Sequence, residues 1–215
     1  MIKACIFDLD GVIVDTARYH FLAWSRLANE LDIPFTEADN ERLKGVSRMK
    51  SLEILLSLGS GVPVDERTKE ELAARKNAWF VEYITHMDRR EIFPGVEVLI
   101  HDLKQQGVGI GLASSSRNAR QVIDSLGIAD AFDAIVDGTM VSHTKPDPEI
   151  FLLAANMLKA PASQCIVFED ATAGVQAALA AGMKCVGVGS REQLGEADIV
   201  VSKTGDIGIA ELQAL

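Results

Sequence analysis

The chain has 215 residues, 48% hydrophobic and 24% charged, which suits one large domain or a core with a smaller second domain. A formal net charge of −10 excludes a general nucleic-acid binder, because such proteins present a basic face. No apolar run approaches the roughly 18 residues of a membrane helix. The opening MIKACIFDLD meets an acid too early for a signal peptide, so we expect none.

The first part of the chain has one strand pattern followed by helical patterns. Apolar residues 3–7 predict a strand that ends directly before Asp8-Leu9-Asp10-Gly11. After it, charged residues stand between apolar ones with the spacing of amphipathic helices. The expected helices cover residues 19–31, 49–58 and 65–85.

From Pro94-Gly95 onward, helix and strand patterns alternate. We expect strands over residues 108–113, 134–136, 165–168, 184–188 and 199–201. Helices are expected over residues 96–106, 117–126, 149–158 and 172–181, with one more at the C-terminus. This alternation predicts βαβ units and a parallel sheet covered by helices on both faces. The expected fold is therefore a Rossmann-like α/β core of residues 1–15 and 92–215, with residues 16–91 inserted as a helical domain.

Polar side chains follow four successive strands, at the edge where parallel sheets bind their ligands. In chain order they are Asp8 with Asp10, then Ser114, then Lys145 in a proline-rich turn, and finally Glu169 with Asp170. Each has a simpler explanation alone: a helix cap for the acids and for Ser114, and a solvated turn for Lys145. Their occurrence at four successive strand ends favours a functional site.

These residue types suit phosphoryl transfer. In an extended chain Asp8 and Asp10 would point to the same side, and with Asp170 they offer hard oxygen ligands for Mg²⁺. A carboxylate at such a metal is close enough to attack a phosphoryl group. A lysine and a hydroxyl can stabilise the equatorial oxygens of that group. Because the whole protein is acidic, an anionic substrate needs a local concentration of positive charge.

Other phosphate-binding and catalytic motifs are missing from the sequence. There is no Gly-Lys pair for a P-loop, no GxSxG and no zinc-ligand spacing. Gly107-Val108-Gly109 begins a dinucleotide-like pattern, but Leu112 stands where its third glycine belongs. Cys5, Cys165 and Cys185 lie in apolar runs, which predicts buried, reduced thiols in a cytosolic protein.

The four motifs in this order resemble the haloacid dehalogenase superfamily over essentially the whole chain. The DxDGx motif runs from Asp8 to Val12, and Ser114, Lys145 and Glu169-Asp170 correspond to the later motifs. The resemblance implies that Asp8 becomes phosphorylated and that Asp10 is the general acid/base. The implied Mg²⁺ ligands are Asp8, Asp10, Glu169 and Asp170. The inserted segment resembles the small helical cap, of four-helix type, that one subgroup carries there.

Within that subgroup, the insertion resembles the cap of the β-phosphoglucomutase family. The similar segments are residues 15–20 followed by Trp24, residues 43–48, residues 75–77 and the loop at 114–118, where a serine and an arginine replace the more usual alanine and lysine. The resemblance implies that Arg48 holds the distal phosphate and that Thr16 and His20 position Asp10. The other implied substrate-binding residues are Trp24, Lys44, Gly45, Lys76, Ser115, Ser116, Arg117 and Asn118.

Simpler readings of the cap residues stay open. Trp24 at a helical spacing is typical of a core residue, His20 of a surface or core histidine, and Lys44 with Arg48 of a solvated loop.

Three function classes also stay open. The first is an isomerase that converts β-D-glucose 1-phosphate to glucose 6-phosphate through a phosphoaspartate and β-glucose 1,6-bisphosphate. The second is a sugar-phosphate phosphatase with the same core. The third is an inactive phosphosugar-binding protein, which the intact Asp8, Asp10, Lys145 and Asp170 argue against. We expect a cytoplasmic monomer that binds Mg²⁺ and a small phosphorylated sugar, but neither nucleic acid nor membrane.

Overall fold

The computed structural model describes residues 2–43, 47–59 and 64–215. The chain forms two compact units: a core unit of Met1–Asp15 with Met87–Leu215, and a cap unit of Thr16–His86. The chain returns from the cap unit to the core unit at Met87, a few residues before the expected boundary at residue 92. Met87 and Ile92 are buried, and the Phe93 amide donates to the Ile13 carbonyl oxygen at 2.8 Å. This short segment therefore belongs to the core unit.

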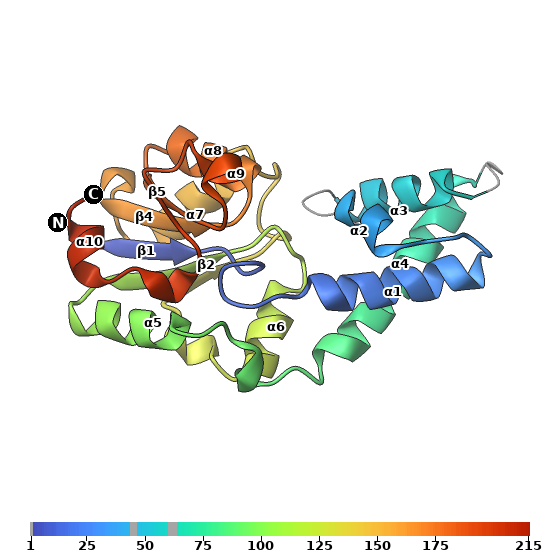
Figure 1. Cartoon of the computed structure of the whole chain (residues 1–215), viewed down its shortest axis with the longest axis horizontal. Coiled ribbons are helices and arrows are strands. Elements are labelled where there is room, and N and C mark those ends of the chain that lie inside the picture. The colour runs from blue at the N-terminus through green and yellow to red at the C-terminus, as the bar shows by residue number, and fades with distance from the viewer. Residues whose placement is uncertain (1, 44–46, 60–63) are drawn as a thin grey trace. The chain divides into compact units, whose positions relative to one another are not determined.

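The core unit is built on a six-stranded sheet with the order β3-β2-β1-β4-β5-β6 (Figure 1). All neighbouring strands are parallel. The strands are β1 (Ala4–Phe7), β2 (Gly109–Ala113), β3 (Ala134–Val136), β4 (Cys165–Glu169), β5 (Lys184–Val188) and β6 (Ile199–Val201). Each predicted strand is confirmed, with ends that differ by no more than one residue.

The strand order brings the motif residues to one place. β1 lies between β2 and β4, and Phe7 pairs with Leu112 on one side and Phe168 on the other. Asp8, Ser114 and Glu169 therefore stand at the carboxyl ends of three adjacent strands. The order reverses at β1, which is the point where open α/β sheets bind ligands.

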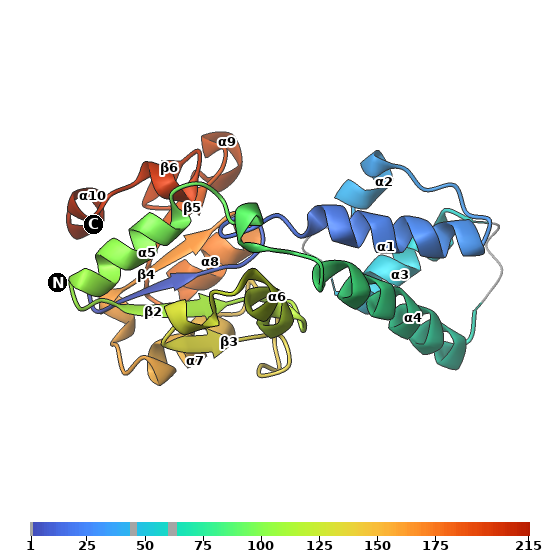
Figure 2. The ribbon, with the colours of Figure 1, turned by 90° about the horizontal axis from the view of Figure 1, so that it is seen from below.

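Helices cover both faces of the sheet (Figure 2). One face carries α5 (Val96–Gln105) and α6 (Ala119–Leu126), and the other carries α7 (Glu149–Met157) and α8 (Thr172–Ala180). Right-handed crossovers require this arrangement, because the chain adds β2 and β3 in one direction and β4 and β5 in the other. Ile6, Val167 and Phe151 belong to the hydrophobic core between the sheet and α7 and α8.

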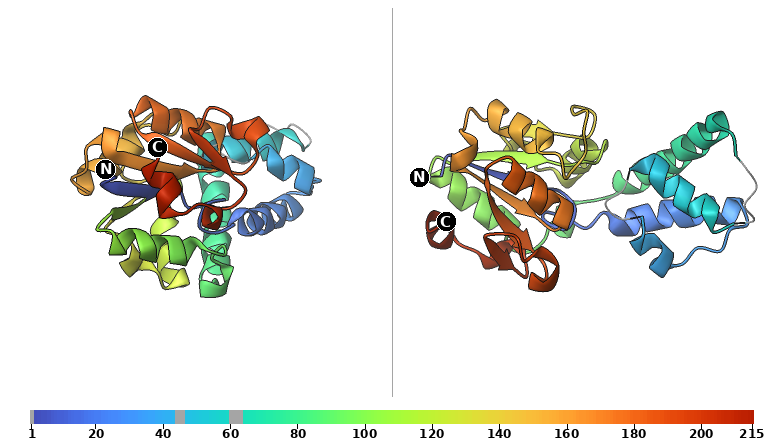
Figure 3. Two further views of the ribbon diagram at one scale, coloured as in Figure 1. Left: turned by 60° about the vertical axis from the view of Figure 1, so that its left-hand side comes forward. Right: turned by 90° about the horizontal axis from the view of Figure 1, so that it is seen from above.

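Several one-turn elements complete the core unit and were not predicted, because a single turn has too few residues to show a period. They are η1 (Arg89–Glu91), η2 (Ala129–Ala131), η3 (Ala162–Gln164), α9 (Arg191–Leu194) and η4 (Thr204–Asp206). The predicted C-terminal helix is α10 (Ile209–Gln213), and both termini lie near the amino ends of the strands (Figure 3).

The cap unit is helical in its described part and has its own hydrophobic core. Its helices are α1 (Ala17–Glu30), α2 (Glu37–Glu41), α3 (Arg48–Ser57) and α4 (Glu66–Ile84). Trp24, Leu27 and Leu52 are nearly or fully buried in this core. Ser47 and Asp65 cap α3 and α4 by accepting backbone hydrogen bonds from Lys50 and Thr68. None of the described helices is long and apolar enough to cross a membrane.

Candidate active site

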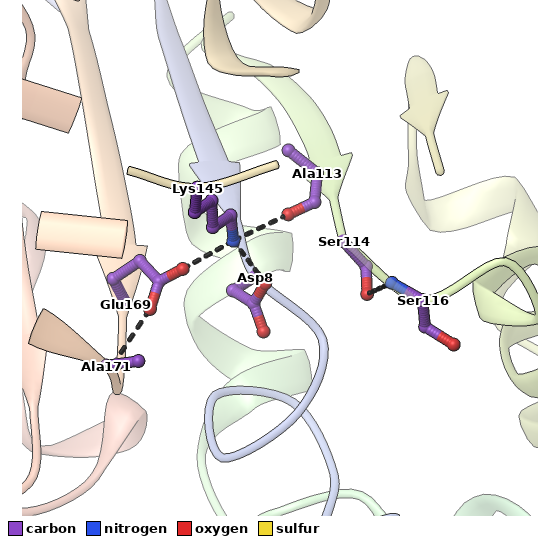
Figure 4. A network of polar contacts seen from close by, with 7 residues as sticks. All are labelled: Asp8, Ala113, Ser114, Ser116, Lys145, Glu169 and Ala171. Atoms are coloured by element: carbon purple, nitrogen blue, oxygen red, sulfur yellow. Dashed lines mark hydrogen bonds and ion pairs between the residues drawn. The ribbon is translucent and has the colours of Figure 1, made fainter. Parts of the chain in front are cut away.

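The centre of the site is Lys145, whose ammonium group lies between two carboxylates (Figure 4). Its Nζ atom donates to Asp8 Oδ1 at 2.5 Å, to Glu169 Oε1 and to the Ala113 carbonyl oxygen at 3.3 Å. The side chain of Lys145 is only 9% exposed. A solvated turn, the simpler reading of Lys145, is therefore wrong. Contacts to β1, β2 and β4 fix the lysine at the centre of the sheet edge.

Glu169 is held on both sides of its carboxylate. One oxygen contacts Lys145, and Oε2 accepts a hydrogen bond from the Ala171 amide at 2.9 Å. A Cβ atom at Gly174, in the first turn of α8, would lie 1.9 Å from Glu169 Oε1, so this turn leaves no room for a larger residue. With both oxygens engaged, the geometry favours Glu169 as the group that orients Lys145 over the implied role of metal ligand.

Asp10 and Asp170 both lie just beyond a strand end. β1 ends at Phe7, the chain then bends at Leu9 and turns at Gly11–Ile13, and β4 ends at Glu169. The expectation that Asp8 and Asp10 point to the same side assumed an extended chain, and it stays a prediction because both residues lie beyond the end of β1. Burial is the main cause of the raised pKa of Asp8 and of Asp170, and the negative charge of Asp10 raises both pKa values further. Gly11 has φ +75°, and a Cβ there would lie 2.1 Å from Asp170 Oδ2. Only glycine allows this approach.

The site has more negative than positive charge. Burial raises the pKa of Asp8, the Glu169 and Asp10 carboxylates raise it further, and Lys145 opposes the shift. Burial, then Glu169 and Asp10, raise the pKa of Asp170 to about 7. Burial lowers the pKa of Lys145, but Asp8 and Glu169 more than offset this, so the lysine stays charged. A divalent cation would relieve the carboxylate repulsion and keep Asp8 ionised, so the donor set fits Mg²⁺.

Ser114 is buried directly after β2. Its amide donates to the Val136 carbonyl oxygen at 3.0 Å, and its Oγ accepts from the Ser116 amide at 3.2 Å. The reading of Ser114 as a helix cap is wrong, because α6 begins only at Ala119. Ser116 Oγ in turn accepts from the Asn118 amide at 3.3 Å. These contacts shape a hydroxyl-bearing loop beyond the strand.

The same loop contains the remaining predicted residues of the core unit. Ser115 and Arg117 are exposed, and Ser116 and Asn118 are partly buried. A Cβ at Gly138 would lie 2.2 Å from the Ser115 carbonyl oxygen, so the segment after β3 passes directly against the loop.

Lys76 and His20 form a pair within the cap unit, with Lys76 buried and His20 partly buried. Lys76 Nζ lies 2.7 Å from His20 Nδ1, and it also lies over the rings of Trp24 and Phe80. Burial lowers the pKa of Lys76 to about 7, with a further contribution from Arg48. Burial, followed by Lys76 and Arg48, holds the pKa of His20 well below its usual range. The cap unit thus brings the basic side chains of Lys76, His20 and Arg48 close enough to influence one another's charge.

The other cap residues have varied surroundings. Arg48, the first residue of α3, donates from Nη2 to Asn77 Oδ1 at 2.8 Å. Trp24 is 3% exposed and belongs to the hydrophobic core of the cap unit, which confirms the simpler reading of its spacing. Thr16 is also buried, directly before α1. Lys44 and Gly45 lie outside the described residues.

Sequence reasoning missed three residues that support the site. Asn77 holds Arg48, Gly174 makes room for Glu169, and Glu149 closes the loop of Lys145. A glycine inside a helix is a detectable signal, since it costs about 1 kcal/mol against alanine and needs a packing reason. The roles of Asn77 and Glu149 depend on contacts that no local pattern shows.

Residues 2–182 match the haloacid dehalogenase-like hydrolase family, and the chain belongs to that family. Among individual proteins, a β-phosphoglucomutase of Bacillus subtilis is 48% identical over 206 residues, covering 95% of this chain and 91% of that protein. The crystal structure of a β-phosphoglucomutase from Clostridium difficile has a TM-score of 0.91 at 43% identity, covering 100% of this chain and 96% of that chain. A phosphorylated carbohydrates phosphatase of Thermotoga maritima is 33% identical over 184 residues, covering 85% of this chain and 82% of that protein.

Proposed function

We propose that this enzyme is a β-phosphoglucomutase that interconverts β-D-glucose 1-phosphate and glucose 6-phosphate. The observation that carries the proposal is the buried Asp8 paired with Lys145 at the sheet edge, in a chain 48% identical over 95% of its length to a β-phosphoglucomutase. Asp8 is the candidate nucleophile because it stands at the carboxyl end of a central strand, where its charge is balanced by a fixed ammonium group.

The proposed reaction has two phosphoryl transfers. Phosphorylated Asp8 gives its phosphoryl group to the 6-hydroxyl of β-glucose 1-phosphate, which forms β-glucose 1,6-bisphosphate. After the bisphosphate reorients, Asp8 accepts the phosphoryl group from the 1-position and glucose 6-phosphate leaves. Asp10 takes the proton from the attacking hydroxyl in the first transfer and returns it to the leaving oxygen in the second. Lys145 and Ser114 stabilise the transferring group.

A magnesium ion fits the carboxylates at this edge. Asp8, Asp10 and Asp170 would hold it, and when bound it would neutralise charge on the transferring phosphoryl oxygens. Support comes from the raised pKa of Asp170 and of Asp8, which follow from carboxylates crowded in a buried place without enough positive charge. Glu169 remains the partner of Lys145.

The cap unit supplies groups for the second phosphate of the substrate. We assign Arg48 to the phosphate that is not reacting, and Thr16 and His20 to the positioning of Asp10. The groups assigned to the rest of the sugar phosphate are Lys44, Gly45, Lys76, Ser115, Ser116, Arg117 and Asn118. Trp24 contributes by packing under Lys76.

We also propose that the enzyme works as a monomer in the cytoplasm. The three cysteines are free and buried, as expected for a chain that folds without disulfides.

A sugar-phosphate phosphatase is the second candidate, because a phosphatase of T. maritima is 33% identical over 85% of this chain. Both functions use the same phosphorylated Asp8. They differ in the acceptor of the phosphoryl group, which is a sugar hydroxyl in one and water in the other.

The deciding experiment supplies β-glucose 1-phosphate, Mg²⁺ and trace β-glucose 1,6-bisphosphate and measures glucose 6-phosphate and free phosphate together. The mutase proposal expects glucose 6-phosphate to form much faster than free phosphate. The variant Asp8→Asn serves as the blank, since an amide of the same shape cannot attack. If the wild-type enzyme releases free phosphate faster than it isomerises the sugar phosphate, the phosphatase candidate replaces the mutase.

A further inference from the structure

Lys145 lies in a segment without regular structure between β3 and α7, yet its ammonium group is fixed to within a hydrogen bond of three acceptors. Ser142, His143, Thr144 and Pro146 in this segment are exposed. Exposed residues bury little apolar surface, so packing alone does not hold the segment. The ordering must come from specific polar contacts, and these converge on one side chain.

That side chain is Glu149, the first residue of α7. Its carboxylate accepts hydrogen bonds from the Ser142 amide at 3.0 Å and from the His143 amide at 2.8 Å. The His143 ring is also in contact, with Nδ1 at 3.0 Å from Oε2. The two backbone bonds are the main reason that the pKa of Glu149 lies below its usual range; burial opposes this shift, and the contact with His143 adds to it. Glu149 thus accepts as a charged group, and such bonds are stronger than neutral ones.

A second set of contacts closes the same segment from inside. The Glu149 amide donates to Asp147 Oδ1 at 2.9 Å, and the Asp147 amide donates to the Thr144 carbonyl oxygen at 3.0 Å. Lys145 therefore lies in a loop from Ser142 to Glu149, and the carboxylate of Glu149 closes this loop by its hydrogen bonds to the Ser142 and His143 amides.

In this loop, three possible metal-ligand atoms lie within 4.8 Å of one another, one each from His143, Asp147 and Glu149. Each carboxylate already accepts a backbone amide, so the cluster is explained by the closure of the loop.

We propose that Glu149 is a positioning residue for phosphoryl transfer: it closes the 142–149 loop and thereby holds Lys145 Nζ against Asp8 and Glu169. Lys145 Nζ lies over the ring of Phe151, 4.8 Å from the ring centroid. At the sheet edge the same atom contacts Asp8 and Glu169 (Figure 4). If the hydrogen bonds at Ser142 and His143 were lost, the loop could open and Lys145 could move away from Asp8 and Glu169. This role rests on the proposed phosphoryl transfer to Asp8 but not on the identity of the sugar.

The test measures the rate of Asp8 phosphorylation from a small donor, acetyl phosphate, together with kcat and KM for β-glucose 1-phosphate. Glu149→Ala should lower both the phosphorylation rate and kcat by about 10- to 100-fold, because misplacement of a catalytic group by about 1 Å costs that much. KM for the sugar phosphate should change little. Glu149→Gln, which keeps the shape and one acceptor oxygen, should lose only about threefold.

Two controls separate positioning from general damage. Glu97→Gln alters the equivalent first-turn acid of α5, whose partner is the exposed Arg89, and should leave both rates unchanged. His143→Ala removes the ring contact but keeps both amide donors to Glu149, so it should cost less than Glu149→Ala. Thermal unfolding of each variant shows whether the fold is intact.

The decisive measurement is a double-mutant cycle with Lys145→Ala. If Glu149 acts through Lys145, then Glu149→Ala should cost nothing further once the lysine is gone. Full multiplication of the two losses would overturn the proposal, as would an unchanged phosphorylation rate in Glu149→Ala. If the mutase assignment is wrong, the products formed from the sugar phosphate would differ from those expected. The result of the double-mutant cycle for Asp8 phosphorylation would stay the same.

Discussion

At the residue scale, two lysines with buried side chains, Lys145 and Lys76, have opposite surroundings. Lys145 has two carboxylate partners, and its pKa is raised. Lys76 has His20 and aromatic rings around it, and burial lowers its pKa to about 7. The ammonium group of Lys145 therefore stays charged near neutral pH. Lys76 can lose its proton near neutral pH.

The shifted pKa of Lys76 predicts a pH dependence of stability. Below about pH 7 the lysine is charged in both states, and the cost of burying the charge is fully present. Between the folded pKa of about 7 and the unfolded value of 10.5, only the unfolded chain keeps the proton, so this cost fades as pH rises. Lys76→Met, which has no charge to bury, should therefore be more stable than the wild type at pH 6, by at most roughly 5 kcal/mol.

Urea unfolding of both proteins from pH 6 to pH 10.5 checks this expectation. The advantage of Lys76→Met should shrink steadily above pH 7 and vanish near pH 10.5. Groups that titrate in both proteins cancel in the difference. Two stability curves that stay parallel over this range would contradict a buried lysine with a lowered pKa.

At the element scale, the junction between β4 and α8 decides where Glu169 can lie. The strand delivers Glu169 to the sheet edge, and the first turn of α8 approaches it so closely that Gly174 has no room for a side chain. Glycine is a poor helix former, so its presence in α8 reflects the carboxylate beside it. The helix and the strand must fit each other before Lys145 can be oriented.

Gly174→Ala tests this fit. Alanine favours the helix by about 1 kcal/mol, yet its Cβ would overlap Glu169 Oε1, so we expect kcat to fall at least about tenfold. The measurement is the phosphorylation rate of Asp8 with circular dichroism of the same samples. The control Ala173→Gly changes helix propensity by a similar amount at the preceding position and should affect stability but not the rate. A fully active Gly174→Ala enzyme would show that Glu169 has freedom to move.

At the scale of the whole molecule, the two units have separate hydrophobic cores. Residues of the sheet, α7 and α8 form one, and Trp24, Leu52 and Leu72 belong to the other. The chain leaves the core unit after Asp15 and returns at Met87. The hydrogen bond between the Phe93 amide and the Ile13 carbonyl oxygen fastens the two ends of the insertion within the core unit. We therefore expect the core unit to fold without the cap unit.

This division predicts the behaviour of a protein in which a Gly/Ser linker of about eight residues, which spans roughly 15 Å, replaces residues 16–86. It should unfold cooperatively and still form phospho-Asp8 from acetyl phosphate, because the motif residues all belong to the core unit. Conversion of β-glucose 1-phosphate to glucose 6-phosphate should be lost, since Arg48, Lys76 and His20 are gone. Thermal unfolding and the two activity assays check this. A linker protein that does not fold, or one that still isomerises the sugar phosphate, would contradict the proposed division of labour.

The sequence by itself was sufficient for the fold class, the strands and the motif residues. Its alternation of apolar strands and amphipathic helices is local information, and each strand could be placed because a buried parallel strand needs an unbroken apolar run. Asp8, Ser114 and Glu169 could be assigned to one edge because parallel strands share their carboxyl ends. The helix α2, with the sequence EADNE, was missed because a short polar segment has no apolar period.

Only the tertiary structure decided which of these residues are partners. Lys145 contacts Asp8 and Glu169, and both oxygens of Glu169 have partners. Trp24 is a core residue that lies under Lys76. Most of these contacts join parts of the chain that are distant in sequence. The expectation that Asp8 and Asp10 share a side assumed an extended chain, whereas β1 ends at Phe7 and the chain bends at Leu9. Periodicity describes a side chain's direction relative to its own element. Distances between elements depend on strand order and packing, and these arise only when the whole chain is folded.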